Sequence, residues 1–413
     1  MTFEIYYTMA KPRHIVGLDI GTHTIKVLSA FRKPDQGEFE ISSKVDEYSF
    51  GVRKGVVIDP HKVGEIISGL VSKAREESGQ KIDGVYANIG GGHLSCVSSH
   101  GLVSVSRADR KISDEDVERA IQAAKTFLLP SNKEIIDIFP RDFAVDGECG
   151  IKQPAGLEGV RLEADILALS CFSPYLKNSS QAILNSGLYI NDLLPSSLAA
   201  ARAVLTPRER ELGAAVLDIG AGTTDMAVFE EGGVIDVAVF PVGSENITND
   251  IAVCLPVDVD IAEKIKLEFG SYIDSIPQNK FAKSPKKIKI DGEEPIIFSH
   301  KKLAEIIEAR VCEIFSMANK ELKRISKYGA LPGGVILTGG GAKLPGIKNL
   351  AKKELKLPVR IGVAEMFSSL DNDPALATLA GLVAHGFDIE EENQKSGINI
   401  LGRVKRALRV FIP

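Results

Sequence analysis

Residues Val216 to Phe229 read Val-Leu-Asp-Ile-Gly-Ala-Gly-Thr-Thr-Asp-Met-Ala-Val-Phe, and this stretch decides the fold of the chain. Apolar runs at Ala214–Leu217 and Met226–Phe229 flank a turn of Asp, Gly and Thr residues, which predicts a β-hairpin with a polar tip. Glycines let backbone N–H groups approach an anion, and threonine hydroxyls add donors, so the tip is suited to phosphate. A carboxylate at Asp218 would repel bare phosphate and makes sense there only beside a divalent cation. Taken alone, the pattern fits an ordinary tight hairpin with polar turn residues equally well.

The pattern occurs a second time, near the start of the chain. Gly-Leu-Asp-Ile-Gly-Thr-His-Thr at 17–24 places Asp19 where Asp218 stands in the later copy, and Gly21 where Gly220 stands. Two copies predict two similar domains that face each other across one ligand, with one loop from each side. Neither copy has the sequence G-x-x-x-x-G-K-[ST] and neither is predicted to open a helix, so the chain is not a P-loop protein.

Length, charge and cysteine usage exclude several classes of protein. A chain of 413 residues is long for one compact core and predicts two or more domains. The net charge of −5, with no basic stripe, argues against nucleic acid as the main partner. The 5 cysteines are far apart and the 7 histidines are scattered, which predicts reduced cysteines in a cytoplasmic chain and no zinc-type cluster. The first twelve residues do not form a signal peptide, and no apolar run is long enough to predict a transmembrane helix.

Other motifs are distributed along the chain between the predicted strands and helices. A segment from Leu94 to about Glu163, with a helix capped at Ser113, predicts a small α+β insertion with a structural role. In a helix at 258–269, Glu263 and Lys266 lie on one face, and by themselves they favour a solvated salt bridge. A strand at 335–337 runs into Thr-Gly-Gly-Gly-Ala-Lys and a helix, the arrangement that seats an anion or a flat ring against backbone.

The last part of the chain has a different character. Residues 388–397 are acidic and polar, and they are predicted to form a flexible linker. In 398–413, apolar residues recur at helical spacing with basic residues on the other side, which favours a helix lying in an anionic membrane surface over a helix packed on the body. The apolar set is Ile400, Leu401, Val404, Leu408 and Phe411, and the basic set is Arg403, Lys405, Arg406 and Arg409.

Together, the two Asp-Ile-Gly hairpins, the Thr-Gly-Gly-Gly turn and the Ala-Glu-Lys-Ile-Lys helix at 262–266 resemble the actin–Hsp70–sugar kinase superfamily. More narrowly, residues 14–413 are similar to the FtsA family of bacterial cell-division actin homologues. The most specific matches are Gly-Ile-Lys-Gln-Pro-Ala-Gly-Leu-Glu-Gly-Val-Arg at 150–161 and Ile-Thr-Asn-Asp-Ile-Ala at 247–252. The resemblance implies an α/β fold, the two-domain actin-like ATPase fold, with an inserted α+β subdomain (1C) and a C-terminal amphipathic helix. The implied divisions are an N-terminal extension at 1–12, 1A at 13–84 with 166–203 and 374–387, 1C at 85–165, 2A at 204–235 with 330–373, 2B at 236–329, the linker at 388–397 and the membrane-targeting helix at 398–413.

The resemblance also implies a site for ATP and Mg²⁺ between the domains. Motif by motif, the residues expected around the phosphates are Asp19, Gly21, Thr22, His23, Thr24, Asp218, Gly220, Ala221, Gly222, Thr223, Thr224 and Gly243, with Asp19 and Asp218 facing the metal through water. Those expected around the adenosine are Glu263, Lys266, Gly339, Gly340, Gly341 and Lys343, which overturns the simple salt-bridge interpretation of Glu263 and Lys266.

Hydrolysis is expected to be slow. Hydrolysing relatives such as MreB have a water-orienting carboxylate or amide just before an alanine-rich helix, and alignment on Ala-Ala-Ala at 199–201 puts Ser196 at that place. A serine hydroxyl can bond water but is a poor general base at neutral pH. We therefore expect ATP to act mainly as a structural and switching ligand that the protein hydrolyses slowly at most.

The function implied by the resemblance is a division protein on the cytoplasmic face of the membrane at the division site. It would form filaments there, bind the C-terminal tail of FtsZ through 2B, and recruit downstream division proteins. Arg310 is the cation expected to contact FtsZ, although a solvated surface arginine fits the same position. A pilus-assembly adaptor ATPase is the nearest alternative, a small-molecule kinase would need a substrate site that we do not find, and a chaperone would need a peptide-binding domain after about residue 386.

Overall fold

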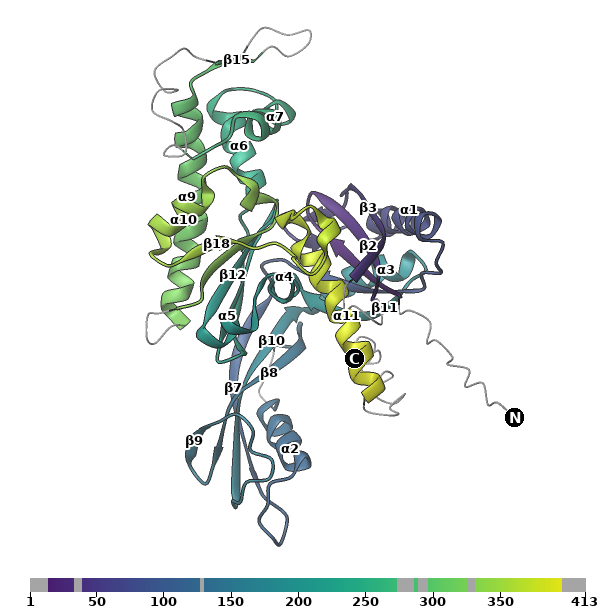
Figure 1. The fold of residues 1–413 in the computed structure, drawn as a ribbon, viewed down its shortest axis with the longest axis vertical. Coiled ribbons are helices and arrows are strands. Elements are labelled where there is room, and N and C mark those ends of the chain that lie inside the picture. Colours follow the sequence, from purple (N-terminus) through teal and green to yellow (C-terminus); the bar gives the residue numbers. More distant parts are fainter. Residues whose placement is uncertain are drawn as a thin grey trace, which may run out of the picture.

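Two five-stranded sheets are built around the paired hairpins, one in each half of a computed structural model of the chain (Figure 1). The structure describes residues 14–32, 39–126, 130–272, 286–288, 296–325 and 331–395. The predicted N-terminal extension at 1–12 and the predicted membrane helix at 398–413 therefore lie outside the described residues, together with most of the polar stretch at 273–295.

The first sheet has the strand order β11-β6-β1-β2-β3. Its central hairpin pairs β1 and β2 antiparallel, and β6 joins β1 in parallel. The strands β1 and β2 are buried along most of their length because helices pack on both faces of the sheet. The bounds are β1 (His14–Ile20), β2 (Thr24–Arg32), β3 (Phe39–Tyr48), β6 (Gly84–Ile89) and β11 (Tyr189–Pro195), with helices α1 (Pro60–Ser78), α3 (Ser173–Asn185), α4 (Ser196–Val204) and α11 (Ala377–Lys395) and the short strands β4 (Val52–Arg53) and β5 (Val56–Val57).

The second sheet repeats this plan with the order β14-β13-β12-β17-β18. Its central hairpin pairs β12 and β13 antiparallel, and β17 joins β12 in parallel as β6 joins β1. The two sequence repeats are therefore two structural repeats, as predicted from the paired motifs. The bounds are β12 (Ala214–Ile219), β13 (Thr224–Glu230), β14 (Gly233–Phe240), β17 (Gly334–Thr338) and β18 (Val359–Ile361), with α5 (Pro207–Leu212), α6 (Ser244–Cys254), α7 (Val259–Phe269), α9 (His300–Ile325) and α10 (Ile347–Leu355), the turns η2 (Gly340–Lys343), η3 (Ser368–Leu370) and η4 (Pro374–Leu376), and the strands β15 (Lys286–Ile288) and β16 (Ile296–Phe298).

The predicted insertion is a four-stranded sheet with one helix packed on it, and it extends away from the two halves (Figure 1). Its helix begins with the predicted capping box, in which Ser113 accepts from the Asp116 backbone N–H and Asp116 accepts from that of Ser113. Residues 133–145 form one long strand whose pairing with the last strand of the insertion shifts at two irregularities. The bounds are β7 (Ser95–Ser104), β8 (Lys133–Val145), β9 (Glu148–Ile151), β10 (Arg161–Phe172) and α2 (Asp114–Ala124).

The linker predicted at 388–397 is wrong over most of its length, because α11 continues as a helix to Lys395. Its last turns are held to the body by ion pairs of Arg202 with Asp388 and of Arg32 with Glu391. Ile389 also packs against the core. Within the part of the chain that the structure describes, no helix is long and apolar enough to cross a membrane.

Candidate nucleotide site

The tips of the two hairpins meet each other. Both turns are closed in the same way, by a hydrogen bond from Gly21 N to Thr24 O at 3.1 Å and from Gly220 N to Thr223 O at 2.9 Å. A Cβ on Gly222 would lie 2.7 Å from Thr22 Oγ1, so a side chain at 222 would push the loops apart. The fold therefore brings together two loops that are far apart in the sequence.

A cavity of about 560 Å³ lies between the two loops, a size typical of small-molecule sites. Most residues predicted for the nucleotide line it. They are Asp19, Gly21, Thr22, His23, Thr24, Asp218, Gly220, Ala221, Thr223, Glu263, Lys266, Gly339, Gly340, Gly341 and Lys343, and Ser196 lines it too.

Three predicted residues lie beside the cavity without lining it. Thr224 is buried and donates to the Val242 carbonyl at 2.9 Å, because the first residue of β13 points to the opposite side from Thr223. Gly222 packs against the first loop. Gly243 backs the second loop, since a Cβ there would collide with the Ala221 carbonyl.

At the other end of the cavity, the pair predicted in α7 is formed. Lys266 Nζ lies 2.7 Å from Glu263 Oε2 and donates to Thr248 Oγ1 at 2.8 Å. The η2 turn forms the facing wall, where Lys343 Nζ lies 2.6 Å from Asp373 Oδ2. This end therefore combines glycine backbone with a carboxylate and ammonium groups, which suits a flat ring with polar edges.

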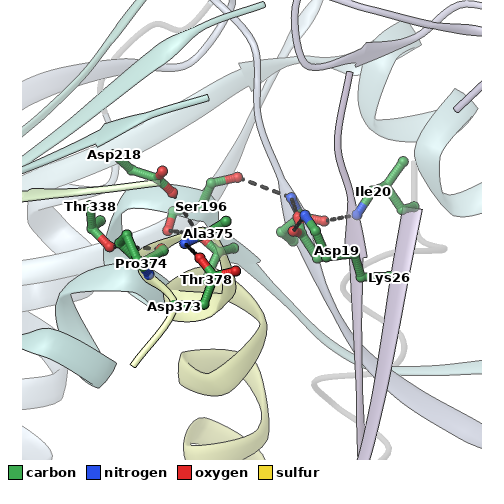
Figure 2. Close-up of polar contacts among 11 residues, drawn as sticks. Asp19, Ile20, Lys26, Ser196, Asp218, Thr338, Asp373, Pro374, Ala375 and Thr378 are labelled. Carbon is green, nitrogen blue, oxygen red and sulfur yellow. Dashed lines mark hydrogen bonds and ion pairs between the residues drawn. The ribbon is translucent and has the colours of Figure 1, made fainter. Parts of the chain in front are cut away.

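The two aspartates that head the hairpin tips are held by different partners (Figure 2). Asp19 lies 3.1 Å from Lys26 Nζ, and the Asn88 amide donates to it at 2.9 Å. Asp218 accepts from Thr378 Oγ1 of α11 at 2.6 Å. Burial raises the pKa of the Asp218 carboxyl to about 6, although the Thr378 hydrogen bond acts in the opposite direction.

Hairpin register explains why the two aspartates differ. In the first hairpin Asp19 lies opposite Lys26, whereas in the second Asp218 lies opposite Asp225. The first copy therefore pairs its carboxylate with an ammonium, and the second pairs it with a further carboxylate. Burial, followed by the charge of Asp218, raises the pKa of Asp225 to about 7.

The donor set fits a hydrated divalent cation. Asp225 Oδ2 accepts from Thr223 Oγ1 at 2.7 Å, but Asp225 Oδ1 is buried and has no hydrogen-bond partner in the structure. Carboxylate oxygens and hydroxyls are the ligands that Mg²⁺ and its waters prefer. Among the described residues, no three His, Cys, Asp or Glu side chains lie close enough together to ligate a metal ion directly, so Asp19, Asp218 and Asp225 could face Mg²⁺ beside a phosphate only through its bound waters.

Several lining residues were missed in the sequence. Asn88, Thr378 and Gly55 come from elements outside the two hairpins, and each hydrogen-bonds a hairpin residue: Asn88 to Asp19, Thr378 to Asp218, and Gly55 N to Thr22 Oγ1 at 2.9 Å. Nothing in their local sequence marks them. Asp225 could have been found by counting the hairpin register from the turn, since it lies directly opposite Asp218.

Arg310, the predicted contact for FtsZ, lies on α9 away from the cavity. Its guanidinium binds Asp250 of α6 through two hydrogen bonds of 2.7 and 2.8 Å, and it also pairs with Glu313. The side chain is therefore partly buried in an ion-pair network, unlike the solvated arginine that was the alternative interpretation.

The fold resembles solved structures of actin-like proteins. A structure titled "PilM-PilN type IV pilus biogenesis complex" matches with a TM-score of 0.61 and 17% identity, covering 90% of this chain and 98% of the other. MreB5 of Spiroplasma citri, in a structure titled as bound to ADP, matches with a TM-score of 0.56 and 14% identity, covering 94% and 99%. At these identities the likeness establishes the two-domain actin-like α/β fold, as the sequence predicted.

Sequence comparison is more specific. The family model described as "Cell division protein FtsA" matches residues 215–381, and the model described as "SHS2 domain inserted in FTSA" matches 91–170. Cell division protein FtsA of Borreliella burgdorferi is 33% identical over 96% of both chains, and that of Pseudomonas aeruginosa is 32% identical over 93% of this chain and 92% of its own. That of Escherichia coli K12 is 31% identical over 90% of each. The chain therefore belongs to the FtsA family of cell division proteins.

Proposed function

We propose that the chain binds ATP with Mg²⁺ in the cavity between its halves and uses it mainly as a switch. This proposal rests on one observation: two similar loops, one from each structural repeat, meet at a single cavity. Carboxylates and glycines line that cavity. The N–H groups of the two tips would bind the phosphates. Asp19, Asp218 and Asp225 would face Mg²⁺ through its waters, and the ion would neutralise phosphate charge when bound.

The adenosine would lie at the other end, between α7 and η2. Glu263 and Lys266 offer an acceptor and a donor to the polar edges of the nucleoside, and Gly339–Gly341 let a ring approach the backbone. Ser196 lies at the phosphate end, where its hydroxyl can bond a water but cannot take a proton efficiently at neutral pH. We therefore expect slow hydrolysis, with product release or exchange resetting the switch.

The test is ATP binding by two variants in different loops. Asp19→Ala removes a carboxylate that would face the metal, and Gly220→Val fills the space at the second tip, where even a Cβ would lie 3.1 Å from the Thr223 carbonyl oxygen. Both should lower ATP affinity by at least about a hundredfold, which corresponds to about 3 kcal/mol. Gly69→Val is the matched control, because a Cβ at this α1 position meets nothing within 4 Å. Wild-type affinity in both loop variants would refute the nucleotide site.

We further propose that the chain forms filaments on the cytoplasmic face of the membrane and tethers FtsZ there. Family membership and the basic amphipathic sequence at 398–413 support this division-site role over that of a pilus adaptor. The actin-like fold supports assembly into filaments, and recruitment of later division proteins would follow from that position.

Arg310 is the proposed contact for an acidic FtsZ tail peptide. Because Arg310 already binds Asp250, a single reversal also breaks an internal pair. Arg310→Asp combined with Asp250→Arg keeps the pair but exchanges the charges. We expect peptide affinity to fall in Arg310→Glu and to stay low in the exchanged variant, measured by fluorescence anisotropy. Recovery in the exchanged variant would mean that only the pair matters, and unchanged binding in both would remove Arg310 from the interface.

A further inference from the structure

Asn88 is the last residue but one of β6, and its side chain connects three separate elements. Its Oδ1 accepts from the Ile20 backbone N–H at 2.7 Å, and its Nδ2 donates to Asp19 Oδ1 at 2.9 Å and to Ser196 Oγ at 3.1 Å. The residue is 6% exposed and lines the cavity. One side chain therefore joins the first hairpin to the start of α4.

The surroundings require an amide at this position. The Ile20 N–H donates to this side chain, whereas Asp19 and Ser196 accept from it, and an asparagine amide supplies one acceptor and two donors where a threonine hydroxyl has only one donor. The same two neighbours fix which end of the amide is oxygen and which is nitrogen. Both amide hydrogens and one oxygen lone pair are used, so the side chain is locked in one orientation.

Comparison of the two halves indicates that the fold itself does not need this amide. In the first half, Asn88 is the last residue but one of the strand parallel to the central hairpin, and in the second half the corresponding strand β17 ends in Thr338, which pairs with Asp218. Among the described residues, the Thr338 hydroxyl bonds only backbone carbonyls, those of Gly362 and Pro374. The second half thus closes its sheet with no side-chain bond from this strand to its aspartate, which is held instead by Thr378.

We propose that Asn88 is a positioning residue, which sets the Asp19 carboxylate and the Ser196 hydroxyl at a fixed distance from each other. The inference rests on the proposed nucleotide site. Asp19 would face the metal and Ser196 the water next to the terminal phosphate, so a single amide aligns the two groups (Figure 2 shows Asp19 and Ser196 on the two sides of this contact). Groups that orient a carboxylate on the metal side tune metal affinity more than they tune binding of the rest of the ligand.

The test measures how far Mg²⁺ strengthens the binding of a fluorescent ATP analogue to the full chain. Affinity is determined with excess Mg²⁺ and with EDTA, and their ratio is the Mg²⁺-dependent gain. Asn88→Leu keeps the volume and removes all three bonds. We expect it to lower the gain by about tenfold while the affinity in EDTA stays near that of the wild type.

Asn88→Asp is the second variant, and it should shift the two measurements differently. It keeps the acceptor for the Ile20 N–H but places a carboxylate against Asp19, so affinity in EDTA should fall and the Mg²⁺-dependent gain should rise. A purely structural role for Asn88 would move both variants in the same direction, together with their melting temperatures. This variant also keeps the test decisive if Asn88→Leu does not fold.

Asn178→Leu is the matched control. Asn178 also donates from Nδ2 to a neighbouring element, the Val57 carbonyl at 3.0 Å, but it does not line the cavity, so its loss should leave the gain unchanged. A wild-type gain in folded Asn88→Leu would overturn the positioning role while leaving the nucleotide site intact. A wild-type chain that does not bind ATP would instead overturn both.

Discussion

At the scale of single residues, the difference between the two hairpins has a consequence for stability. Asp225 lies where Lys26 lies in the first copy, and it is buried opposite another carboxylate. A buried carboxylate beside another carboxylate is unfavourable when it is ionised and no cation is near. Ionised Asp225 is therefore expected to destabilise the folded, ligand-free chain. Binding of Mg²⁺ with a nucleotide would remove this destabilisation, so ligand binding should stabilise the folded chain at the junction of the two halves.

We predict that Asp225→Asn stabilises the ligand-free protein in a pH-dependent way. The folded-state pKa of Asp225, about 7, lies above the ordinary value of 3.8, so the folded state binds the proton more tightly than the unfolded state. The destabilisation is therefore absent below about pH 4, grows as the pH rises, and is complete above about pH 7, with an upper limit on the order of 4 kcal/mol. Urea unfolding of both proteins from pH 5 to 8 would measure it. A stability difference that does not change with pH would contradict the prediction.

At the scale of elements, the inserted sheet takes no part in forming the nucleotide cavity. None of the residues lining the cavity comes from β7 to β10 or from α2. The helix α2 lies so close to β7 that a Cβ on Gly101 would collide with Ala120 O and Ala124 N and would approach Ala124 Cα to 2.8 Å. Glycine at 101 is thus required by helix-on-strand packing, whatever ligand the protein binds.

We predict that Gly101→Ala loosens the insertion and leaves nucleotide binding intact. Overpacking at such a contact costs about 1–3 kcal/mol, and α2 can relieve it only by moving away from the sheet. Hydrogen exchange should become faster in α2 and β7, while the ATP affinity stays that of the wild type. Weakened ATP binding in the variant would show that the insertion and the cavity are coupled through the body.

At the scale of the whole molecule, α11 connects the cavity to the segment proposed to bind membrane. Its first turn places Thr378 against Asp218, and the same helix continues to Lys395, three residues before the sequence 398–413 begins. One element therefore extends from the nucleotide site toward the proposed anchor. A filament would present many such segments to one membrane surface.

We predict that replacing Leu408 and Phe411 by Glu releases the protein from anionic vesicles while ATP binding is kept. Each apolar side chain buried in the interface contributes about 1.5–3 kcal/mol and each surface cation about 1 kcal/mol, but ordering the segment costs on the order of 1 kcal/mol per residue. One segment should thus bind weakly and a filament firmly, through avidity.

Vesicle pelleting with and without ATP is the measurement. Gln394→Glu with Ser396→Glu is the control, because it adds the same negative charge without touching the apolar stripe. Raised salt should weaken binding only partly, since the apolar contribution is not screened. Full binding after deletion of 398–413 would place the anchor elsewhere.

The paired hairpins, the glycine turn at 338–341 and the capped helix of the insertion could be predicted from the amino-acid sequence, because each of these depends on residues that are neighbours in the chain. Local turn chemistry and apolar runs specify such elements without reference to the rest of the fold. The repeat then implied that two loops share one ligand, and most of the predicted lining residues do meet in the cavity.

The side chains that hold those loops in place could not be predicted in this way, because they come from distant parts of the chain. Asn88 and Thr378 donate hydrogen bonds to Asp19 and Asp218, which lie 69 and 160 residues away in the chain. No local sequence pattern predicts such a hydrogen bond. Strand alternation points Thr224 away from the cavity. In the stretch whose composition favoured a linker, Asp388 and Glu391 instead form ion pairs with Arg202 and Arg32 of the body. Each of these outcomes depends on a partner supplied by another element, and such partners exist only once the chain has folded.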